Sequence, residues 1–336
     1  MVTVPDGIAG VTPEWLTEAL GKDVRSVDIG PIGTGQTGCT YRLALDDGTT
    51  LVAKTGAEDP AVRERVAYGY RAELAFYRDI AVTVDVPVPR IHAAVATADC
   101  SQFVLLMDDL APAMQGDQIV GTTGEVAIAG ARGLAGLHGP RWCDPAWKEL
   151  DILTMPQVDE QSAQGMGDLA RMAADTFLQT LGSRLSPEDK ATFDAFPKEI
   201  PEFLLARPER FALLHGDYRL DNLLLHPEGG VTVVDWQTLT VGLPARDLAY
   251  WVTTSLAPEV RRRTEADAVA AYHAALRVEG YDLATCEEDY RAGQLHTLLI
   301  VALGWAFTTQ TERGGDMMTV MAQRACVALR DLGVLA

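Results

Sequence analysis

The sequence predicts an α+β protein of two lobes, a small β-rich N-terminal lobe (residues 1–108) and a larger, mainly helical C-terminal lobe (residues 109–336). Strand-like runs recur up to Met107, whereas apolar residues at helical spacing dominate from Glu125 onward. Between the two regions, residues 108–112 read Asp-Asp-Leu-Ala-Pro, a composition typical of a linker. These observations place the lobe boundary near residue 108.

The N-terminal lobe should begin with a short helix, because Thr12 is a favourable helix cap and Pro13 suits the first helical turn. Strands should follow, two of them joined by the turn sequence Asp46-Asp47-Gly48. The predicted strands are residues 24–29, 40–45, 50–53 and 101–107, and the one long helix is residues 61–79.

Helical periodicity then repeats through the C-terminal lobe. The predicted helices are residues 125–138, 166–181, 187–199, 261–279, 287–307 and 317–332. Short apolar or β-branched runs at residues 211–214, 223–225 and 231–234 predict strands within this region. The candidate catalytic residues lie around these short strands.

The bulk composition excludes several classes of function. A formal charge of −19 opposes binding to nucleic acid or to anionic membranes. The five cysteines form no CxxC pair, so neither a disulfide framework nor a zinc site is expected. Residues 1–15 lack the features of a leader, and the apolar run 295–307 is too short to span a bilayer. We therefore expect a cytoplasmic protein with no nucleic acid and no membrane partner.

The run from His215 to Asn222 carries the strongest chemical signal. Its pattern, His-x-Asp followed four residues later by Asn, with Asp235 after the next hairpin, is typical of a phosphoryl-transfer loop. We expect Asp217 to accept a hydroxyl proton, and Asn222 and Asp235 to bind Mg²⁺ beside nucleotide phosphates. Asp and Asn also serve ordinary turns. Asn222, however, is the only asparagine in the sequence, which favours the functional interpretation.

A glycine-rich segment between two predicted strands is the candidate phosphate-binding loop. Gly33, Gly35 and Gly38 form the pattern GxGxxG, which lets backbone N–H groups approach phosphates. The pattern alone is weak, because it also occurs in simple turns. A strand follows it here, where a dinucleotide-binding fold would require a helix. This context favours a flap over ATP.

Lys54 lies at the end of the strand 50–53, where it can reach the α and β phosphates of ATP. A solvated lysine is the ordinary alternative. Glu73 changes the balance, because it lies within the apolar stripe of the helix 61–79 and would need a cationic partner if buried. We predict a Lys54–Glu73 ion pair, with Glu64 as the alternative carboxylate.

Three further positions have weaker signals. After the apolar strand 101–107, main-chain groups of Asp108 and Leu110 are candidates to bind adenine. Asp247, near the start of a helix, should cap that helix, and bracing of the catalytic loop is a second role. His138 closes an apolar helix and is expected to be a structural hydrogen-bonding residue.

An acidic run at residues 287–289 allows two interpretations. It could form a cation-binding edge of a substrate pocket. Thr285 and Glu288 also fit a capping box, and capping is a sufficient explanation.

Together these motifs resemble the aminoglycoside phosphotransferase and choline kinase superfamily over residues 32–251. The pairing of His-Gly-Asp with Asp235-Trp236-Gln237, and the later runs 271–273 and 289–291, are most similar to its ecdysteroid-kinase-like (CHK-like) branch. The resemblance implies a protein-kinase-like fold of two lobes, with the cofactors ATP and Mg²⁺ bound between them.

The acceptor is expected to be a small molecule. Only 12 positions separate Asp235 from Asp247, too few for the activation segment of a protein kinase. Gly216 also replaces the arginine that would bind a phosphorylated activation loop. No protein substrate is therefore expected.

Three functions remain open at this stage. The first is a kinase for a hydroxyl of a metabolite, sterol-like compound, sugar or hydroxyacyl thioester. The second is an aminoglycoside-modifying kinase, and the third is a non-catalytic nucleotide-binding protein. The presence of Lys54, Asp217, Asn222 and Asp235 disfavours the third.

Overall fold

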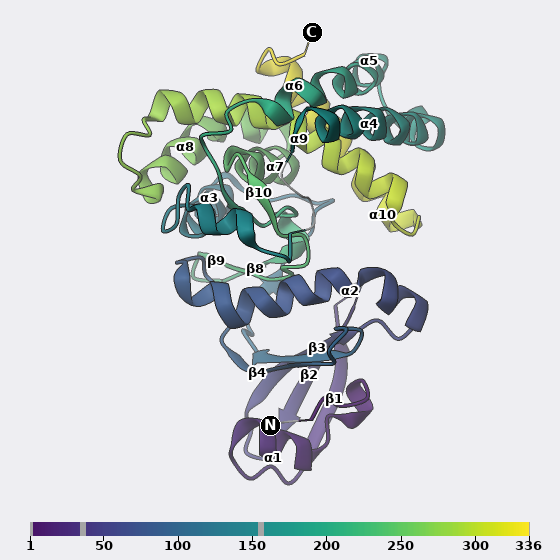
Figure 1. Ribbon diagram of the computed structural model, residues 1–336, viewed down its shortest axis with the longest axis vertical. Coiled ribbons are helices and arrows are strands. Elements are labelled where there is room, and N and C mark those ends of the chain that lie inside the picture. Colours follow the sequence, from purple (N-terminus) through teal and green to yellow (C-terminus); the bar gives the residue numbers. More distant parts are fainter. Residues whose placement is uncertain (1–2, 34–37, 154–157, 336) are drawn as a thin grey trace.

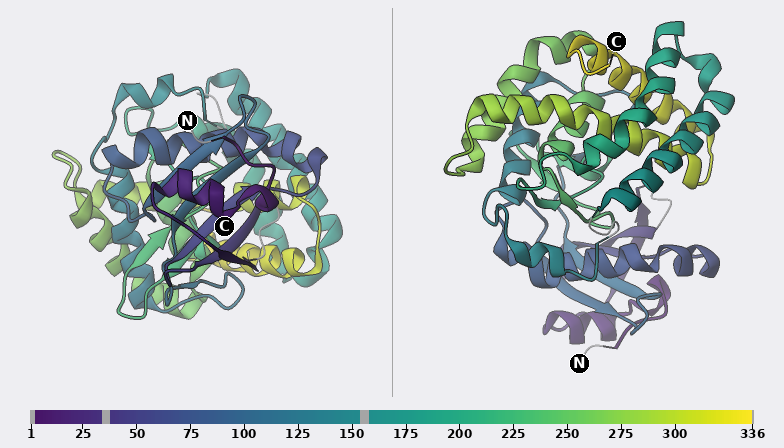
Figure 2. Two further views of the ribbon diagram at one scale, coloured as in Figure 1. Left: turned by 90° about the horizontal axis from the view of Figure 1, so that it is seen from below. Right: turned by 45° about the horizontal axis from the view of Figure 1, so that its top comes forward.

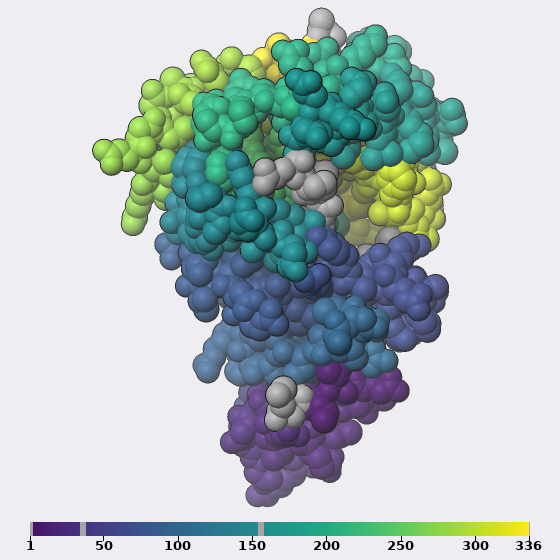
Figure 3. Space-filling view, in the orientation of Figure 1, coloured from purple at the N-terminus to yellow at the C-terminus, as the bar shows by residue number. Residues whose placement is uncertain are grey.

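The computed structural model describes residues 3–33, 38–153 and 158–335. It has the predicted two lobes: strands gather at the N-terminal end of an elongated molecule and helices at the other (Figure 1). In the space-filling view the N-terminal strands form the narrower end (Figure 3). This is an α+β, protein-kinase-like architecture.

Five antiparallel strands form the main sheet in the described part of the chain, in the order β1-β2-β3-β5-β4. The strands are β1 (Val27–Ile32), β2 (Gly38–Leu45), β3 (Thr50–Gly56), β4 (Ile91–Ala96) and β5 (Phe103–Asp108). The hairpin between β2 and β3 confirms the turn predicted at Asp46-Asp47-Gly48.

Both faces of β5 are buried, which explains its continuous apolar sequence. Val104 and Leu106 face α1 (Pro13–Leu20) in one hydrophobic cluster. Phe103 and Leu105 belong to a second cluster that includes residues of α2 (Pro60–Ala75). Helix α2 runs between the sheet and the C-terminal lobe (Figure 1), so residues on it can reach both.

Several boundaries in the N-terminal lobe were predicted wrongly. β1 begins at Val27, not at residue 24, and it continues through Pro31, which an edge strand tolerates. β3 extends to Gly56, so Lys54 lies inside the strand. The helix predicted to residue 79 changes at Phe76 to a π-helical turn, Phe76–Ile80. The predictions also missed β4, whose alanines give little strand signal.

The C-terminal lobe is mainly helical, as predicted (Figure 2). Its α-helices are α3 (Gly124–His138), α4 (Glu160–Thr180), α5 (Pro187–Ala195), α6 (Ile200–Leu205), α7 (Ala245–Ser255), α8 (Pro258–Leu276), α9 (Leu283–Phe307) and α10 (Glu312–Asp331). Four of them, α4, α8, α9 and α10, begin three to six residues before the predicted starts. The first turns of α4, α8 and α10 are mostly polar and carry no apolar period, whereas α9 begins with Leu283 and Ala284 directly after its cap, Asp282. The helix predicted for residues 187–199 ends at Ala195 and a 3₁₀ turn containing Pro197 follows, since proline cannot donate a helical hydrogen bond.

Short strands hold the region between the lobes. β6 (Met114–Gln115), β8 (Leu223–Leu225) and β9 (Val231–Val233) form one small sheet, and β7 (Ala212–Leu214) pairs with β10 (Thr240–Gly242). β6 and β10 were not predicted, because Met114-Gln115 and the glycine-containing Thr240–Gly242 lack the apolar or β-branched runs that indicated β7, β8 and β9. Within the described residues, no helix is both long and apolar enough to cross a bilayer.

Candidate active site

The predicted catalytic loop, residues 215–222, connects β7 to β8, and a side chain of α7 binds its backbone. The Asp247 carboxylate accepts the N–H groups of His215 (2.7 Å) and Gly216 (3.2 Å). Gly216 has φ +81°, and a Cβ there would lie 2.2 Å from the carbonyl oxygen of Thr238. Only glycine fits this position. The same constraint explains why no arginine occupies it.

Asp247 therefore braces the loop, and this predicted role is confirmed. The predicted capping role is not, because its carboxylate binds the loop instead of the start of α7. His138 lies behind it, with Nε2 3.5 Å from Asp247 Oδ2 and Nδ1 2.8 Å from the Tyr272 hydroxyl. Burial raises the pKa of Asp247, but His138 and His215 outweigh it and keep the pKa below its ordinary value. His138 is structural, as predicted.

Three donors reach the Asp217 carboxylate among the described residues. Asn222 Nδ2 donates to Oδ2 (2.9 Å), and the Tyr250 hydroxyl donates to Oδ1 (2.9 Å). Arg219 Nε lies 3.0 Å from both oxygens, and its Nη1 lies 2.6 Å from Asp221 Oδ2. The side chain of Asp217 remains 26% exposed, so a ligand can still reach it.

Asn222 and Asp235, the predicted metal ligands, are brought together by the backbone. The Val234 N–H donates to the Asn222 carbonyl (3.0 Å), and Asp235 follows at once. Asp235 has φ +67°, a left-handed conformation that Asp tolerates better than most residues. Because Asn222 Nδ2 donates to Asp217, its Oδ1 is the side-chain atom suited to a cation.

The predicted Lys54–Glu73 ion pair is present. Lys54 Nζ lies 2.7 Å from Glu73 Oε2 and 3.2 Å from Asp235 Oδ1, so it also joins the two lobes. Gln237 Nε2 donates to the same Glu73 oxygen (3.2 Å). Glu64, the alternative carboxylate, is exposed. Glu73 is buried, and Lys54 is therefore the cation that compensates it.

The pKa values of Lys54 and Asp235 shift toward their ionised forms, whereas burial raises the pKa of Glu73. Burial lowers the pKa of Lys54, but the carboxylates of Asp235 and Glu73 raise it more, and the net pKa lies above its ordinary value. Burial likewise raises the pKa of Asp235, and Lys54 more than offsets it, so the net pKa is lowered. An ammonium thus faces an ionised carboxylate where phosphates and metal are expected.

The glycine-rich segment is described only at its ends. Gly33 follows β1 with φ +77°, which favours glycine. Gly38 opens β2, and a Cβ there would lie 2.9 Å from the Thr55 carbonyl oxygen and 3.7 Å from Lys54 Cε. Glycine at 38 therefore lets β2 pass close to the Lys54 strand. Gly35 lies outside the described residues.

The candidate adenine contacts lie at the end of β5. The Asp108 N–H donates to the Arg90 carbonyl (3.0 Å), and the Leu110 carbonyl accepts the Ala113 N–H (2.9 Å). Asp108 could therefore offer only its carbonyl, and Leu110 its N–H. Between them, Asp109 accepts two bonds from Arg42 of β2, 2.7 and 3.1 Å long, which hold this segment against the sheet.

The acidic run 287–289 is divided between an ion pair, made by Asp289, and the edge of a cavity, which Glu288 lines. Helix α9 begins at Leu283 and Asp282 caps it, accepting the Thr285 N–H (2.8 Å), so the predicted capping box was wrong. Asp289 is buried and accepts bonds from Arg207 (2.9 Å) and Arg210 (2.8 Å).

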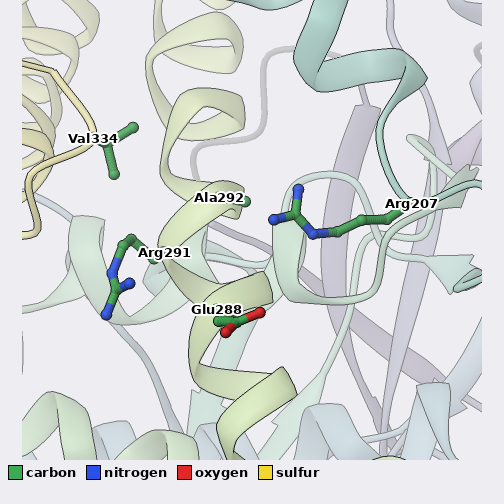
Figure 4. Close-up of a pocket in the computed structure, with 5 residues that line it drawn as sticks. All are labelled: Arg207, Glu288, Arg291, Ala292 and Val334. Atoms are coloured by element: carbon green, nitrogen blue, oxygen red, sulfur yellow. The ribbon is translucent and has the colours of Figure 1, made fainter.

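A cavity of about 350 Å³ lies beside this ion pair (Figure 4). None of the predicted site residues is among those described as lining it. Its lining combines two guanidinium groups with one carboxylate, and Arg207 is already paired with Asp289. The lining residues are Arg207, Glu288, Arg291, Ala292 and Val334.

Sequence reasoning missed Arg219 and Tyr250, the residues that hold Asp217 together with Asn222. Arg219 stands inside the motif that was recognised, and an arginine two residues after an acidic residue was a usable signal. Tyr250 lies 33 positions after Asp217, and nothing local distinguishes it from an ordinary core tyrosine.

A family model described as the phosphotransferase enzyme family matches residues 28–285. Solved structures share the fold over most of the chain. A Ralstonia eutropha protein named as a candidate aminoglycoside phosphotransferase is 18% identical, with a TM-score of 0.57 over 95% of this chain and 97% of that one. An ethanolamine kinase of Plasmodium vivax is 12% identical, with a TM-score of 0.55 over 93% of this chain and 86% of that one. Aminoglycoside 2'-phosphotransferase-IIIa, solved with GDP, is 13% identical, with a TM-score of 0.56 over 92% of this chain and 96% of that one.

Curated relatives match over a short segment only. Acyl-CoA dehydrogenase family member 10 of Mus musculus is 50% identical over 48 residues, which is 14% of this chain and 4% of that protein. Family member 11 of Homo sapiens is 46% identical over 41 residues, 12% of this chain and 5% of that protein. The chain thus matches only a small part of the length of these relatives.

Proposed function

The chain belongs to the phosphotransferase enzyme family, and from this premise we propose that it transfers the γ-phosphoryl group of ATP, with Mg²⁺, to a hydroxyl of a small molecule. One observation carries the proposal. Asp217, Asn222, Asp235 and Lys54, which come from both lobes, are linked by direct contacts and by one backbone hydrogen bond, from Val234 to Asn222. A base, metal ligands and a phosphate-binding cation are the parts that phosphoryl transfer requires.

The donor atoms suit Mg²⁺. Asn222 offers a neutral amide oxygen and Asp235 an ionised carboxylate, and Mg²⁺ prefers a few such oxygens together with phosphate oxygens. When bound, the ion would neutralise charge on the phosphates. In the same site, Lys54 would hold the α and β phosphates. The glycine-rich segment that begins at Gly33 and ends at Gly38 is the proposed phosphate-binding loop.

Main-chain groups at the end of β5 suit adenine. The Asp108 carbonyl could accept a hydrogen bond from the exocyclic amine of adenine. Two residues later in the chain, the Leu110 N–H could donate to a ring nitrogen of the same base. The GDP complex of aminoglycoside 2'-phosphotransferase-IIIa supports a nucleotide as the phosphate donor in this fold. We place the boundary between the lobes at this segment, after Asp108.

The acceptor is proposed to be a small molecule. In the short stretch from Asp235 to Asp247, β10 pairs with β7 and α7 begins immediately afterwards, which supports the absence of a protein-binding activation segment. The name of the ethanolamine kinase that shares this fold identifies its acceptor as a small alcohol. A cytoplasmic location, where ATP is available, belongs to the same proposal.

An aminoglycoside acceptor has less support. Such a polycation needs a pocket lined by carboxylates. The cavity in Figure 4 has none of Lys54, Asp217, Asn222 and Asp235 among its lining residues, so its charges carry no argument about the acceptor. The aminoglycoside phosphotransferases share the fold at 13–18% identity, which does not extend to their acceptors. The ecdysteroid-kinase-like branch likewise stays a prediction.

MgATP should stabilise the wild-type protein, and Asp235→Asn should remove most of that effect. A free MgATP concentration of 100 times its Kd would add about 2.7 kcal/mol to the free energy of unfolding. The neutral amide loses the charge that attracts the metal. Thermal unfolding with ATP, with MgATP and with Mg²⁺ alone measures this. A wild-type protein that MgATP leaves unchanged would contradict the proposal.

The acceptor is best found by screening hydroxylated metabolites, including antibiotics, for ADP release. Asp217→Asn serves as the blank, because it keeps the size of the side chain and loses the base. A true acceptor gives ADP release with wild-type protein and about 10²- to 10⁴-fold less with Asp217→Asn. Equal release by both proteins would exclude the role proposed for Asp217.

A further inference from the structure

Tyr250 reaches the catalytic carboxylate from outside the catalytic loop. It lies on α7, one turn after Asp247, so the same face of the helix holds the loop backbone and the Asp217 side chain. Its ring is only 2% exposed and belongs to the same buried cluster as Leu295 and Leu298 of α9. The hydroxyl therefore has a nearly fixed position.

The three donors on Asp217 are not equivalent. Asn222 donates to both the carbonyl and the carboxylate of Asp217, and it is also a proposed metal ligand. Arg219 is shared between Asp217 and Asp221, and it lies on the loop itself. Tyr250 alone of the three comes from a rigid core helix and has no proposed contact with metal or phosphate. It can hold Oδ1 whatever the ligands do.

Packing alone does not explain the Tyr250 hydroxyl. Phenylalanine would fill the same volume, and a buried hydroxyl must find a partner to offset the loss of water. Here the partner is Oδ1 of Asp217, the proposed base, 2.9 Å away. A carboxylate has about four acceptor directions, and the three donors make four contacts with Asp217, two on each oxygen. These donors therefore jointly set the orientation of the carboxylate.

We infer that Tyr250 is a positioning residue for phosphoryl transfer, holding Oδ1 of Asp217 so that the exposed part of the carboxylate keeps one orientation toward the acceptor hydroxyl. The inference rests on the proposed function. In the step itself, the hydroxyl proton passes to Asp217, and the acceptor oxygen bonds to the γ-phosphorus. The bond from that phosphorus to the β–γ bridging oxygen breaks, and ADP leaves with the electron pair.

The test compares Tyr250→Phe with Tyr290→Phe, using MgATP with water as the acceptor and ADP release as the readout. Tyr290 is a matched control: it is also buried, and its hydroxyl donates to a carboxylate, Glu265 Oε2, at 3.2 Å. Tyr250→Phe should lower kcat about 5- to 50-fold, part of the general-base contribution, with the KM for ATP unchanged. Tyr290→Phe should keep the wild-type kcat.

A double-mutant cycle separates positioning from a general loss of structure. In an Asp217→Asn background, Tyr250→Phe should have almost no further effect on kcat, because the carboxylate that it orients is gone. Thermal unfolding and MgATP stabilisation of Tyr250→Phe should stay close to those of Tyr290→Phe.

Two results would overturn the inference alone. The first is a kcat for Tyr250→Phe equal to that of Tyr290→Phe. The second is a fold-loss of kcat on Tyr250→Phe that is as large in the Asp217→Asn background as in the wild type. Wild-type protein that neither releases ADP nor gains stability from MgATP would instead overturn the proposed function, and the inference with it.

Discussion

Asp217 is held on both of its carboxylate oxygens, by Asn222 and Arg219 on one side and by Tyr250 and Arg219 on the other. Phosphoryl transfer has a loose transition state and asks little base strength of the protein. The hydrogen bonds on both oxygens therefore serve to fix the orientation of the Asp217 carboxylate.

Gly216 is the residue at which the loop geometry is most sensitive. Gly216→Ala should lower the free energy of unfolding by about 3 kcal/mol or more, through left-handed strain together with a clash against Thr238. The activity should fall as well, because the N–H groups that bind Asp247 would shift. Denaturant unfolding of the variant and the wild type gives the difference.

Gly280→Ala isolates the strain from the clash. Gly280 has φ +78°, close to the +81° of Gly216, but a Cβ there meets nothing within 4 Å. This control should cost only about 1 kcal/mol. Equal losses for the two variants would mean that Thr238 moves away without cost.

At the scale of elements, α7 organises the site and α10 secures the helices around it. Arg324 of α10 is buried and donates to the carbonyls of Gln118, Ile119 and Thr254, the last of these near the end of α7. Gln118 in turn accepts the N–H of Leu220 in the catalytic loop (2.9 Å). A chain of hydrogen bonds thus links α10 to the loop.

Asp331, at the end of α10, should matter for stability. It pairs with Arg262 (2.8 Å) and with Arg261, which is buried on α8. Asp331→Asn would leave Glu265 as the remaining carboxylate partner of Arg261 and should cost about 1.5–3 kcal/mol, measured by denaturant unfolding. Asp316→Asn is the control. Asp316 also lies on α10, and its ion pair with Arg184 is exposed and should contribute little to stability.

The same ion pair predicts an acid-sensitive contribution. Burial raises the pKa of Asp331, but Arg262 and Arg261 outweigh it and hold the pKa below the ordinary 3.8. Its contribution is therefore complete above about pH 4 to 5 and is lost as the pH falls through the folded-state pKa. The difference between wild type and Asp331→Asn should shrink on acidification.

At the scale of the whole molecule, the lobes meet through Lys54 and Asp235, where MgATP is proposed to bind. MgATP should therefore slow amide exchange in β3 and in the loop 215–222 together, while α10 changes little. Hydrogen exchange with mass spectrometry measures this. Protection confined to one lobe would contradict a site built from both.

Much of the site was predictable because its chemistry is local in sequence. The loop from His215 to Asn222, the nearby Asp235, and the pair of Lys54 with Glu73 lie within short spans, and their residue types alone state the chemistry. Burial of Glu73 followed from its place in an apolar stripe. Alternating and helical periods likewise predicted the two lobes, because burying one face imposes a period on the sequence.

By itself, then, the sequence determined the two-lobe fold, the residue types of the catalytic loop and the candidate metal ligands. Tertiary structure alone decided that Asp247 braces that loop, that Tyr250 reaches Asp217, and that the short strands β6 and β10 form. The physical reason is range: these contacts join residues far apart in the chain, and packing of whole helices and strands, which no local pattern encodes, brings them together.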